Sequence, residues 1–217
     1  YYISNVTITN GASDGSGGGV FIKNNTLVID NSIITSNQSN DIGSGLYADN
    51  STLIIRDSEI SANENYGIDA NDMHLINSNV IGNTGGGVSY GGGNILNCNL
   101  SDNSGRAIIS DTYSSKTVIG NFIKNNTGGG LNVAMYSSLG YFCLNEVENN
   151  HAWRGGGILT GFRVNGVFSN NLITRNTATE SGGGCYLSGR QEMRNSIILL
   201  NSAGESGGGV YHNSGFL

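Results

Sequence analysis

Residues 170–201 read NNLITRNTATESGGGCYLSGRQEMRNSIILLN, and this stretch contains every element of the repeat that decides the fold. It opens with the phrase NNLITRN, which closes on Asn176, and a short spacer then leads to a run of glycines and the apolar Cys185. A second phrase, NSIILLN, closes on Asn201, 25 residues after the first. A period of this length is typical of repeat architectures.

The glycine phrase recurs along the whole chain as Gly-x-Gly followed by an apolar residue, with weaker copies in the middle. We call this apolar residue the anchor. Successive anchors are 20 to 27 residues apart. The anchors are Val20, Leu46, Ile68, Val88, Ile108, Leu131, Ile158, Cys185 and Val210.

Two further ladders keep step with the anchors. The closing asparagines are Asn37, Asn63, Asn83, Asn103, Asn126, Asn150, Asn176 and Asn201. Eight residues before each of them lies an apolar residue: Ile29, Ile55, Leu75, Ile95, Val118, Phe142, Phe168 or Met193. Because the three ladders stay in phase throughout, we predict one repeat domain over residues 1–217, either whole or a fragment of a longer repeat protein.

The local pattern favours strands over helices. Apolar residues alternate over short runs such as 52–57 and never reach helical length, and Val, Ile, Thr and Tyr fill these runs. Glycine suits one corner of a coil, and asparagine suits another, where stacked side chains can form an amide ladder. The spacers between the closing asparagines and the glycines are expected to be loops outside the stack. We therefore predict an all-β fold, a single-stranded right-handed parallel β-helix of about nine rungs of roughly 24 residues.

Composition narrows the function classes. The chain has 16 acidic and 10 basic residues and a net charge of −6, which argues against a nucleic-acid partner. No apolar run is long enough to span a membrane. Cys98, Cys143 and Cys185 are too few for a disulfide framework and are expected to be buried thiols. No metal-ligand spacing or cofactor motif appears, so we expect neither a metal nor a cofactor.

The paired phrases GGG-aliphatic and aliphatic-x-x-Asn, as in Gly128 to Leu131 and Val147 to Asn150, resemble the short repeats of the polymorphic outer-membrane proteins. They are also similar to those of the wider group of secreted bacterial β-helices with a pectin-lyase-like fold, autotransporter passengers among them. The resemblance extends from about Ile3 to Tyr211. It implies an extracellular or cell-surface location, with roles from adhesin to polysaccharide-degrading enzyme.

Asp49 and Asp69 are the weak candidates for catalysis. They should face outward on neighbouring rungs, offset by two residues, and a separation of roughly 8 Å would suit an inverting glycosidase. Asp72 and His74 extend the same neighbourhood. Exposed aspartates also keep β-surfaces soluble, and we favour that interpretation.

A second candidate is a binding site. His151, Trp153 and Arg154 lie in the spacer before a glycine phrase, with Arg163 beyond it. Trp beside Arg suits a sugar-stacking platform, although a hydrophobic lid over the rung edge is the favoured alternative for Trp153.

Aromatic residues also recur one position after the anchor, as Phe21 with Tyr47 and as Tyr186 with Tyr211. Such pairs can bind carbohydrate or simply stabilise a sheet.

The leading hypothesis is a non-catalytic extracellular β-helix that serves as a structural, adhesive or carbohydrate-binding module, with a polysaccharide or cell-surface ligand as partner. A polysaccharide lyase or glycoside hydrolase is the first alternative. The second is a filament subunit, because both ends of the sequence lack polar caps and could stack on other copies.

Overall fold

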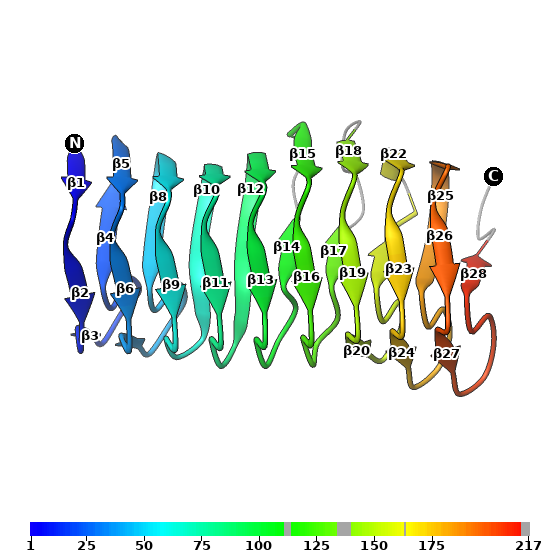
Figure 1. The fold of residues 1–217 in the computed structure, drawn as a ribbon. Coiled ribbons are helices and arrows are strands. Elements are labelled where there is room, and N and C mark those ends of the chain that lie inside the picture. The colour runs from blue at the N-terminus through cyan, green and yellow to red at the C-terminus, as the bar shows by residue number, and fades with distance from the viewer. Residues whose placement is uncertain (111–113, 134–139, 163, 214–217) are drawn as a thin grey trace.

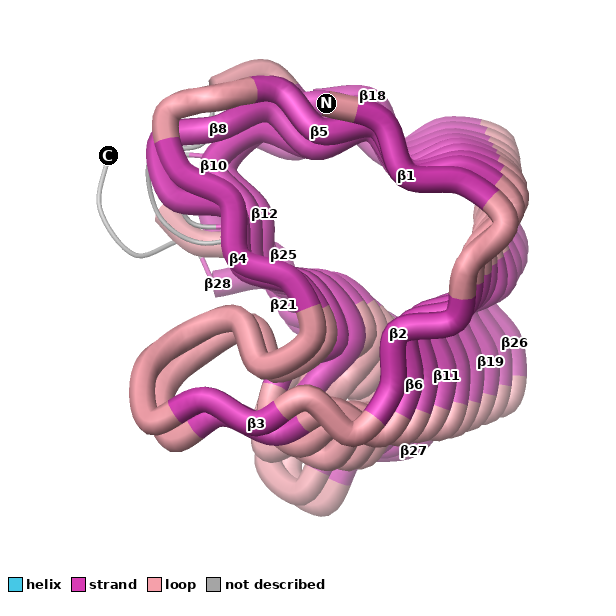
Figure 2. Tube along the Cα trace, turned by 90° about the vertical axis from the view of Figure 1, so that its left-hand side faces the viewer, coloured by secondary structure: helices cyan, strands magenta, loops and turns pink. Residues whose placement is uncertain are grey.

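The computed structural model describes residues 1–110, 114–133, 140–162 and 164–213, and within them all regular secondary structure is β-strand. Figure 1 shows the strands stacked side by side in successive coils, with the N-terminus and the last strand at opposite ends. Viewed from the N-terminal end, the chain in Figure 2 runs clockwise from β1 through β2, β3 and β4 to β5 while it recedes. The predicted right-handed parallel β-helix is confirmed.

One face of the solenoid is a sheet of nine parallel strands, which we call the closing sheet because each strand after the first ends two residues before a closing asparagine. Nine strands correspond to the predicted nine rungs, joined by eight full turns. The strands are β2 (Thr7–Thr9), β6 (Ile33–Thr35), β9 (Glu59–Ser61), β11 (Asn79–Ile81), β13 (Asn99–Ser101), β16 (Phe122–Lys124), β19 (Glu146–Glu148), β23 (Leu172–Thr174) and β26 (Ile197–Leu199).

The other two faces belong to a bent sheet of fourteen strands. Its anchor arm holds the anchors: β4 (Val20–Lys23), β14 (Ile108–Ser110), β17 (Leu131–Val133), β21 (Ile158–Thr160) and β28 (Val210–Asn213). Its back arm holds the third ladder: β1 (Tyr2–Ser4), β5 (Thr26–Asp30), β15 (Lys116–Ile119), β18 (Gly140–Cys143) and β22 (Val164–Ser169). Four strands run through both arms: β8 (Leu46–Arg56), β10 (Tyr66–Ile76), β12 (Gly86–Leu96) and β25 (Cys185–Arg194).

The core contains the three predicted apolar lines, one from each face, together with other inward residues such as Leu53 and Met73. Anchors from Leu46 to Cys185, third-ladder residues from Ile29 to Phe168, and the aliphatics of the closing sheet from Ile34 to Ile173 are all buried. Each such side chain contributes about 1.5–3 kcal/mol by leaving water. In the terminal rungs the equivalent residues, such as Ile8 and Ile198, are only partly buried.

The closing asparagines form a buried amide ladder, as predicted. From Asn37 to Asn176, each Nδ2 donates to the Oδ1 of the next closing asparagine at 2.8–3.1 Å. The same Oδ1 also accepts the backbone N–H of the preceding asparagine at 2.8–3.1 Å. A further bond from Nδ2 reaches a main-chain carbonyl of the closing sheet one rung back, as from Asn126 to Leu100 O at 3.0 Å. The interior amides are therefore fully hydrogen-bonded in spite of their burial.

The glycine phrase packs directly against this ladder. A Cβ on Gly45 would lie 2.4 Å from the carbonyl oxygen of Gly67 and 3.0 Å from Nδ2 of Asn63. Gly157 meets the carbonyl of Gly184 at 2.6 Å and Nδ2 of Asn176 at 3.0 Å. At these positions glycine is thus needed for close approach to the amide stack.

Two details of the coil differ from expectation. The left-handed backbone at the closing corner is carried by the residue before each closing asparagine, such as Ala62 (φ 52°) or Leu200 (φ 57°), so the amide itself can point inward from a strand. The spacers are not simply loops outside the stack. Among them, β3 (Ala12–Ser13) pairs with β7 (Gln38–Ser39). In the later rungs β20 (His151–Ala152), β24 (Thr177–Ala178) and β27 (Ser202–Ala203) form a small sheet.

The cysteines agree only in part with the prediction. Cys98 and Cys185 are buried, and burial raises the thiol pKa to about 11 for Cys98 and about 12 for Cys185. Cys143 instead lies half-buried on the outer side of β18, where Ser169 Oγ donates to its sulfur at 3.1 Å. All three are free thiols.

Tyr90 and Lys116 are polar residues that the repeat pattern did not predict to be inside. The Tyr90 hydroxyl is buried, has no hydrogen-bond partner among the described residues, and its pKa is raised by burial. Lys116 is 1% exposed, pairs in register with Gly93, and donates from Nζ to Ser114 O at 2.8 Å.

Replacing Asn126 with Leu should remove a link from the middle of the ladder. The change leaves buried donors of Asn103 and the carbonyl of Leu100 without partners, so we expect a loss of about 3–5 kcal/mol in unfolding free energy. Chemical denaturation would measure it. Asn79→Leu, on the exposed side of β11, is the control and should change stability by less than about 0.5 kcal/mol. Equal losses in both variants would contradict the role of the ladder.

Tyr90→Phe should have the opposite effect. Removing a buried hydroxyl that lacks a partner should stabilise the fold by about 1 kcal/mol, visible as a higher denaturation midpoint. A lower midpoint would mean that the hydroxyl is hydrogen-bonded to an internal water.

Candidate functional site

The outer side of the anchor arm carries an aromatic pair near the N-terminal end. Phe21 and Tyr47 are register partners on β4 and β8, and their ring centroids are 5.6 Å apart with planes tilted by 33°. Phe21 is 53% exposed and Tyr47 is half-buried. Outward positions of a strand recur every second residue, so both rings share a face with Lys23 and Asp49.

Carboxylates surround this pair. Asp69 is the register partner of Tyr47, and Asp49 lies two residues further along its own strand, as predicted. Lys23 Nζ lies 2.8 Å from Asp49 Oδ2. This bond to Asp49 raises the pKa of Lys23. Burial and, after it, the negative charges of Asp49, Asp69 and Asp41 raise the pKa of Tyr47, so its hydroxyl stays protonated.

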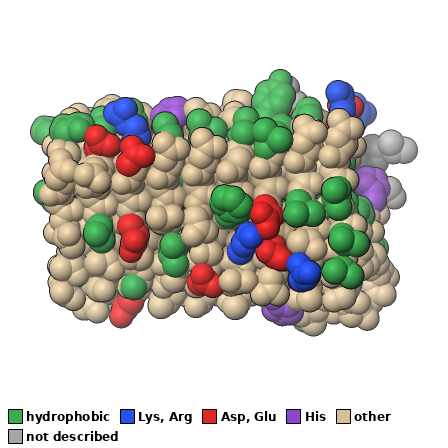
Figure 3. All heavy atoms as spheres, viewed as in Figure 1, with side chains coloured by type: hydrophobic (Ala, Val, Ile, Leu, Met, Phe, Trp, Pro, Cys, Tyr) green, Lys and Arg blue, Asp and Glu red, His purple; other side chains and the backbone are tan. Residues whose placement is uncertain are grey.

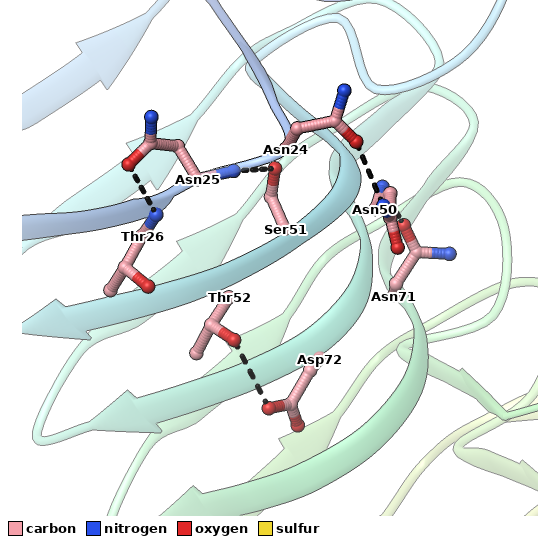
Figure 4. A pocket seen from close by; sticks show the side chains of 8 residues that line it. All are labelled: Asn24, Asn25, Thr26, Asn50, Ser51, Thr52, Asn71 and Asp72. Atoms are coloured by element: carbon pink, nitrogen blue, oxygen red, sulfur yellow. Dashed lines mark hydrogen bonds between the residues drawn. The ribbon is translucent and has the colours of Figure 1, made fainter.

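An amide-lined groove of about 380 Å³ follows at the corner just beyond Lys23 and Asp49 (Figure 4). Asn50 Nδ2 donates to Asn24 Oδ1 at 2.8 Å, and the Asn50 backbone N–H donates to Asn71 Oδ1. Thr52 Oγ1 donates to Asp72 Oδ2 at 3.4 Å. The groove is open to solvent, and amide, hydroxyl and carboxylate groups line it.

The groove was missed at the sequence level. Asn24 and Asn50 have positive φ (53° and 47°) and occupy the bend between the two arms. They hold equivalent positions in successive rungs, and this spacing is the sequence signal that indicates the groove. Asp72 lines this groove, as its predicted neighbourhood with Asp49 suggested. His74 lies further along β10 on the back arm, where its Nδ1 is 3.0 Å from Asn94 Nδ2.

The second predicted cluster lies at the other end of the solenoid. Arg154 donates from Nε to Glu180 Oε1 at 2.7 Å, and its guanidinium lies 5.5 Å from the ring centroid of Tyr186. The Tyr186 and Tyr211 centroids are 5.0 Å apart, with planes tilted by 31°. Arg154 and Tyr211 thus help to cover Tyr186, which is only 8% exposed and presents little ring surface to a ligand.

The residues near Arg154 are arranged differently from the favoured prediction. Trp153 is 65% exposed, so its interpretation as a lid over the rung edge is wrong. His151 belongs to β20, and its Nδ1 is 2.8 Å from Thr177 Oγ1. Arg163 lies outside the described residues. A ligand could reach the exposed His151, Trp153 and Arg154 and the half-buried Tyr211.

A third cluster is structural. Figure 3 shows charged and apolar side chains gathered on the closing sheet toward its C-terminal half. Lys124 pairs with Glu146 at 2.6 Å and Glu148 at 3.1 Å, and Arg175 pairs with Glu148 at 2.8 Å. The bond from Lys124, followed by that from Arg175, lowers the pKa of Glu148. These oppositely charged side chains form ion pairs across successive rungs, which is typical of a stabilising network.

Within the described ranges, no cluster of three or more His, Cys, Asp or Glu side chains is suitable for a metal ion. The same residues include no helix that is long and apolar enough to cross a membrane. Comparison with protein-family models, with curated proteins and with solved structures finds no match to this chain.

Proposed function

We propose that this protein is a non-catalytic, extracellular or surface-exposed binding module. Its ligand site is the Phe21–Tyr47 pair together with the adjoining amide groove, and its ligand is a neutral glycan. The observation that carries the proposal is a partly exposed aromatic pair on the anchor arm with an amide-lined groove at the corner three residues further along the same two rungs. The resemblance of the repeats to secreted bacterial β-helices supports the location.

The chemistry of the site fits a sugar. The C–H face of a pyranose packs on aromatic rings, while its hydroxyls exchange hydrogen bonds with amides and carboxylates. Asn24, Asn50 and Asn71 provide such groups at the corner beyond the rings. Asp49, Asp69 and a net charge of −6 disfavour acidic polysaccharides, so a neutral glycan is the preferred class.

Catalysis by Asp49 and Asp69 is the alternative proposal, for a polysaccharide lyase or glycoside hydrolase. Its support is their expected separation of roughly 8 Å. Against it, Asp49 is held by Lys23 at a position where both side chains are accessible to water (35% and 59% exposed). A general acid normally needs a desolvated environment. End-to-end assembly of copies stays a prediction.

Removing either ring should weaken glycan binding. We expect Phe21→Ala and Tyr47→Ala each to lower affinity about tenfold for the best ligand in a panel of neutral oligosaccharides, measured by calorimetry. Phe122→Ala is the control, because Phe122 has nearly the same exposure (52%) on the closing sheet. Binding that is unchanged in the Phe21 and Tyr47 variants, or lost equally in the control, would exclude this site.

The catalytic alternative is tested on the same panel, extended with polyuronates. Following reducing ends and unsaturated products should reveal no turnover by the wild-type protein. Cleavage that disappears in Asp49→Asn or Asp69→Asn would instead establish the enzyme and refute our proposal.

A further inference from the structure

The outer face of the back arm is unusually apolar for a surface. Its outward residues alternate with the buried third ladder, and six apolar ones occupy successive rungs as a stripe. Ile76, Leu96 and Ile119 share one register line, and Ile54, Tyr141 and Val167 share a second line two residues earlier in each strand. Five are half-buried and Tyr141 is 47% exposed. The outward residues of the closing sheet on the corresponding middle rungs are largely polar, for example Glu59, Asn79 and Asn99. An apolar stripe of this length indicates an interaction surface.

Charged residues mark both ends of the stripe. Asp30 lies on β5, one rung before Arg56, and Glu192 and Arg194 lie on β25. Each end carries one acidic and one basic residue, and Arg194 pairs with Glu192 in its own chain. Asp30 and Arg194 occupy equivalent positions of their strands, so they come together when the face is reversed. The face from the rung of Asp30 to that of Arg194 is roughly 34 Å long at about 4.8 Å per rung.

We propose that this face binds a second copy of the chain, packed antiparallel, with a two-fold axis that passes between the rungs of Leu96 and Ile119. Such an axis places Leu96 of one copy on Ile119 of the other. Reversal of the rungs similarly brings Ile76 to Cys143.

Two further positions match in the same way, whereas Val28 comes opposite Glu192. The axis brings Ile54 opposite Val167, so apolar side chains meet apolar ones on both sides of the centre. Asn94 comes opposite Thr117, which pairs polar side chains at the centre.

At the two ends, Asp30 of each copy comes opposite Arg194 of the other. Two sheets packed in this way lie about 10 Å apart. The contact area of so narrow a stripe is at the low end of the range for specific interfaces. The dimer should therefore be weak, and its population should depend on protein concentration.

Sedimentation velocity over a series of protein concentrations tests the proposal. The wild-type protein should convert from monomer to dimer as its concentration rises. Leu96→Glu places two carboxylates at the centre of the apolar stripe and should raise the dimer Kd at least about tenfold. Ile81→Glu is the matched control, because Ile81 is also a half-buried outward residue, on the closing sheet, and should leave the Kd unchanged.

A charge exchange tests the orientation. Arg194→Glu should weaken the dimer about tenfold, because acid then faces acid twice in each pair of copies. Adding Asp30→Arg to the same chain should restore most of the affinity. Thermal unfolding of each variant checks that the fold is intact.

Three outcomes would overturn the inference. They are a monomer at every concentration, a dimer indifferent to Leu96→Glu (as end-to-end stacking would give), and no recovery in the double variant.

Discussion

The stack of closing asparagines is the interaction on which the rest of the structure depends. Each side-chain amide is fully hydrogen-bonded only when the rungs above and below hold an amide in the same position. Any slip of one rung against the next would leave several buried donors and acceptors without partners. The ladder therefore selects one register for all three faces, including those whose aliphatic side chains could pack in other ways.

Several features of the repeat follow from this stack. The last residue of most glycine phrases lacks a side chain because the amides lie against it, as at Gly45 and Gly157, while Ala107 is an exception. The residue before each closing asparagine must adopt a left-handed conformation, since the chain has to turn before the amide can point inward. Asparagine fills that position at Asn125 and Asn149, while Arg175 and Leu200 adopt it at some conformational cost.

Much of the fold could be predicted because every rung must meet the same packing and hydrogen-bonding requirements. The three apolar lines and the amide ladder were readable from their spacing alone. The closing phrase of the first rung was missed, because NVTITNG has Gly11 where later copies have asparagine, and Gly11 N–H donates to Asn37 Oδ1 instead. The buried Lys116 and Tyr90 were also missed, since their inward direction depends on how each rung fills the space left by glycines such as Gly93.

The candidate sites were harder to predict, because they depend on contacts between rungs that differ from one another. The sequence predicted that Asp49 and Asp69 lie on one face. It did not predict the ion pair between Asp49 and Lys23 or the amide groove beside that pair. It also grouped Tyr186 with Tyr211 without indicating that Arg154 lies over the Tyr186 ring. Outer side chains are free to vary once the ladder fixes the core. The candidate sites therefore lie where outer residues deviate from the repeat.

Hydrogen exchange of the side-chain amides, followed by NMR, tests most directly whether the asparagine ladder holds the fold together. The account predicts that the NH₂ groups of the interior closing asparagines, from Asn63 to Asn176, exchange as slowly as the most protected backbone amides. That of Asn79, exposed on β11, should exchange rapidly. Rapid exchange at the closing asparagines, within an otherwise protected backbone, would contradict it.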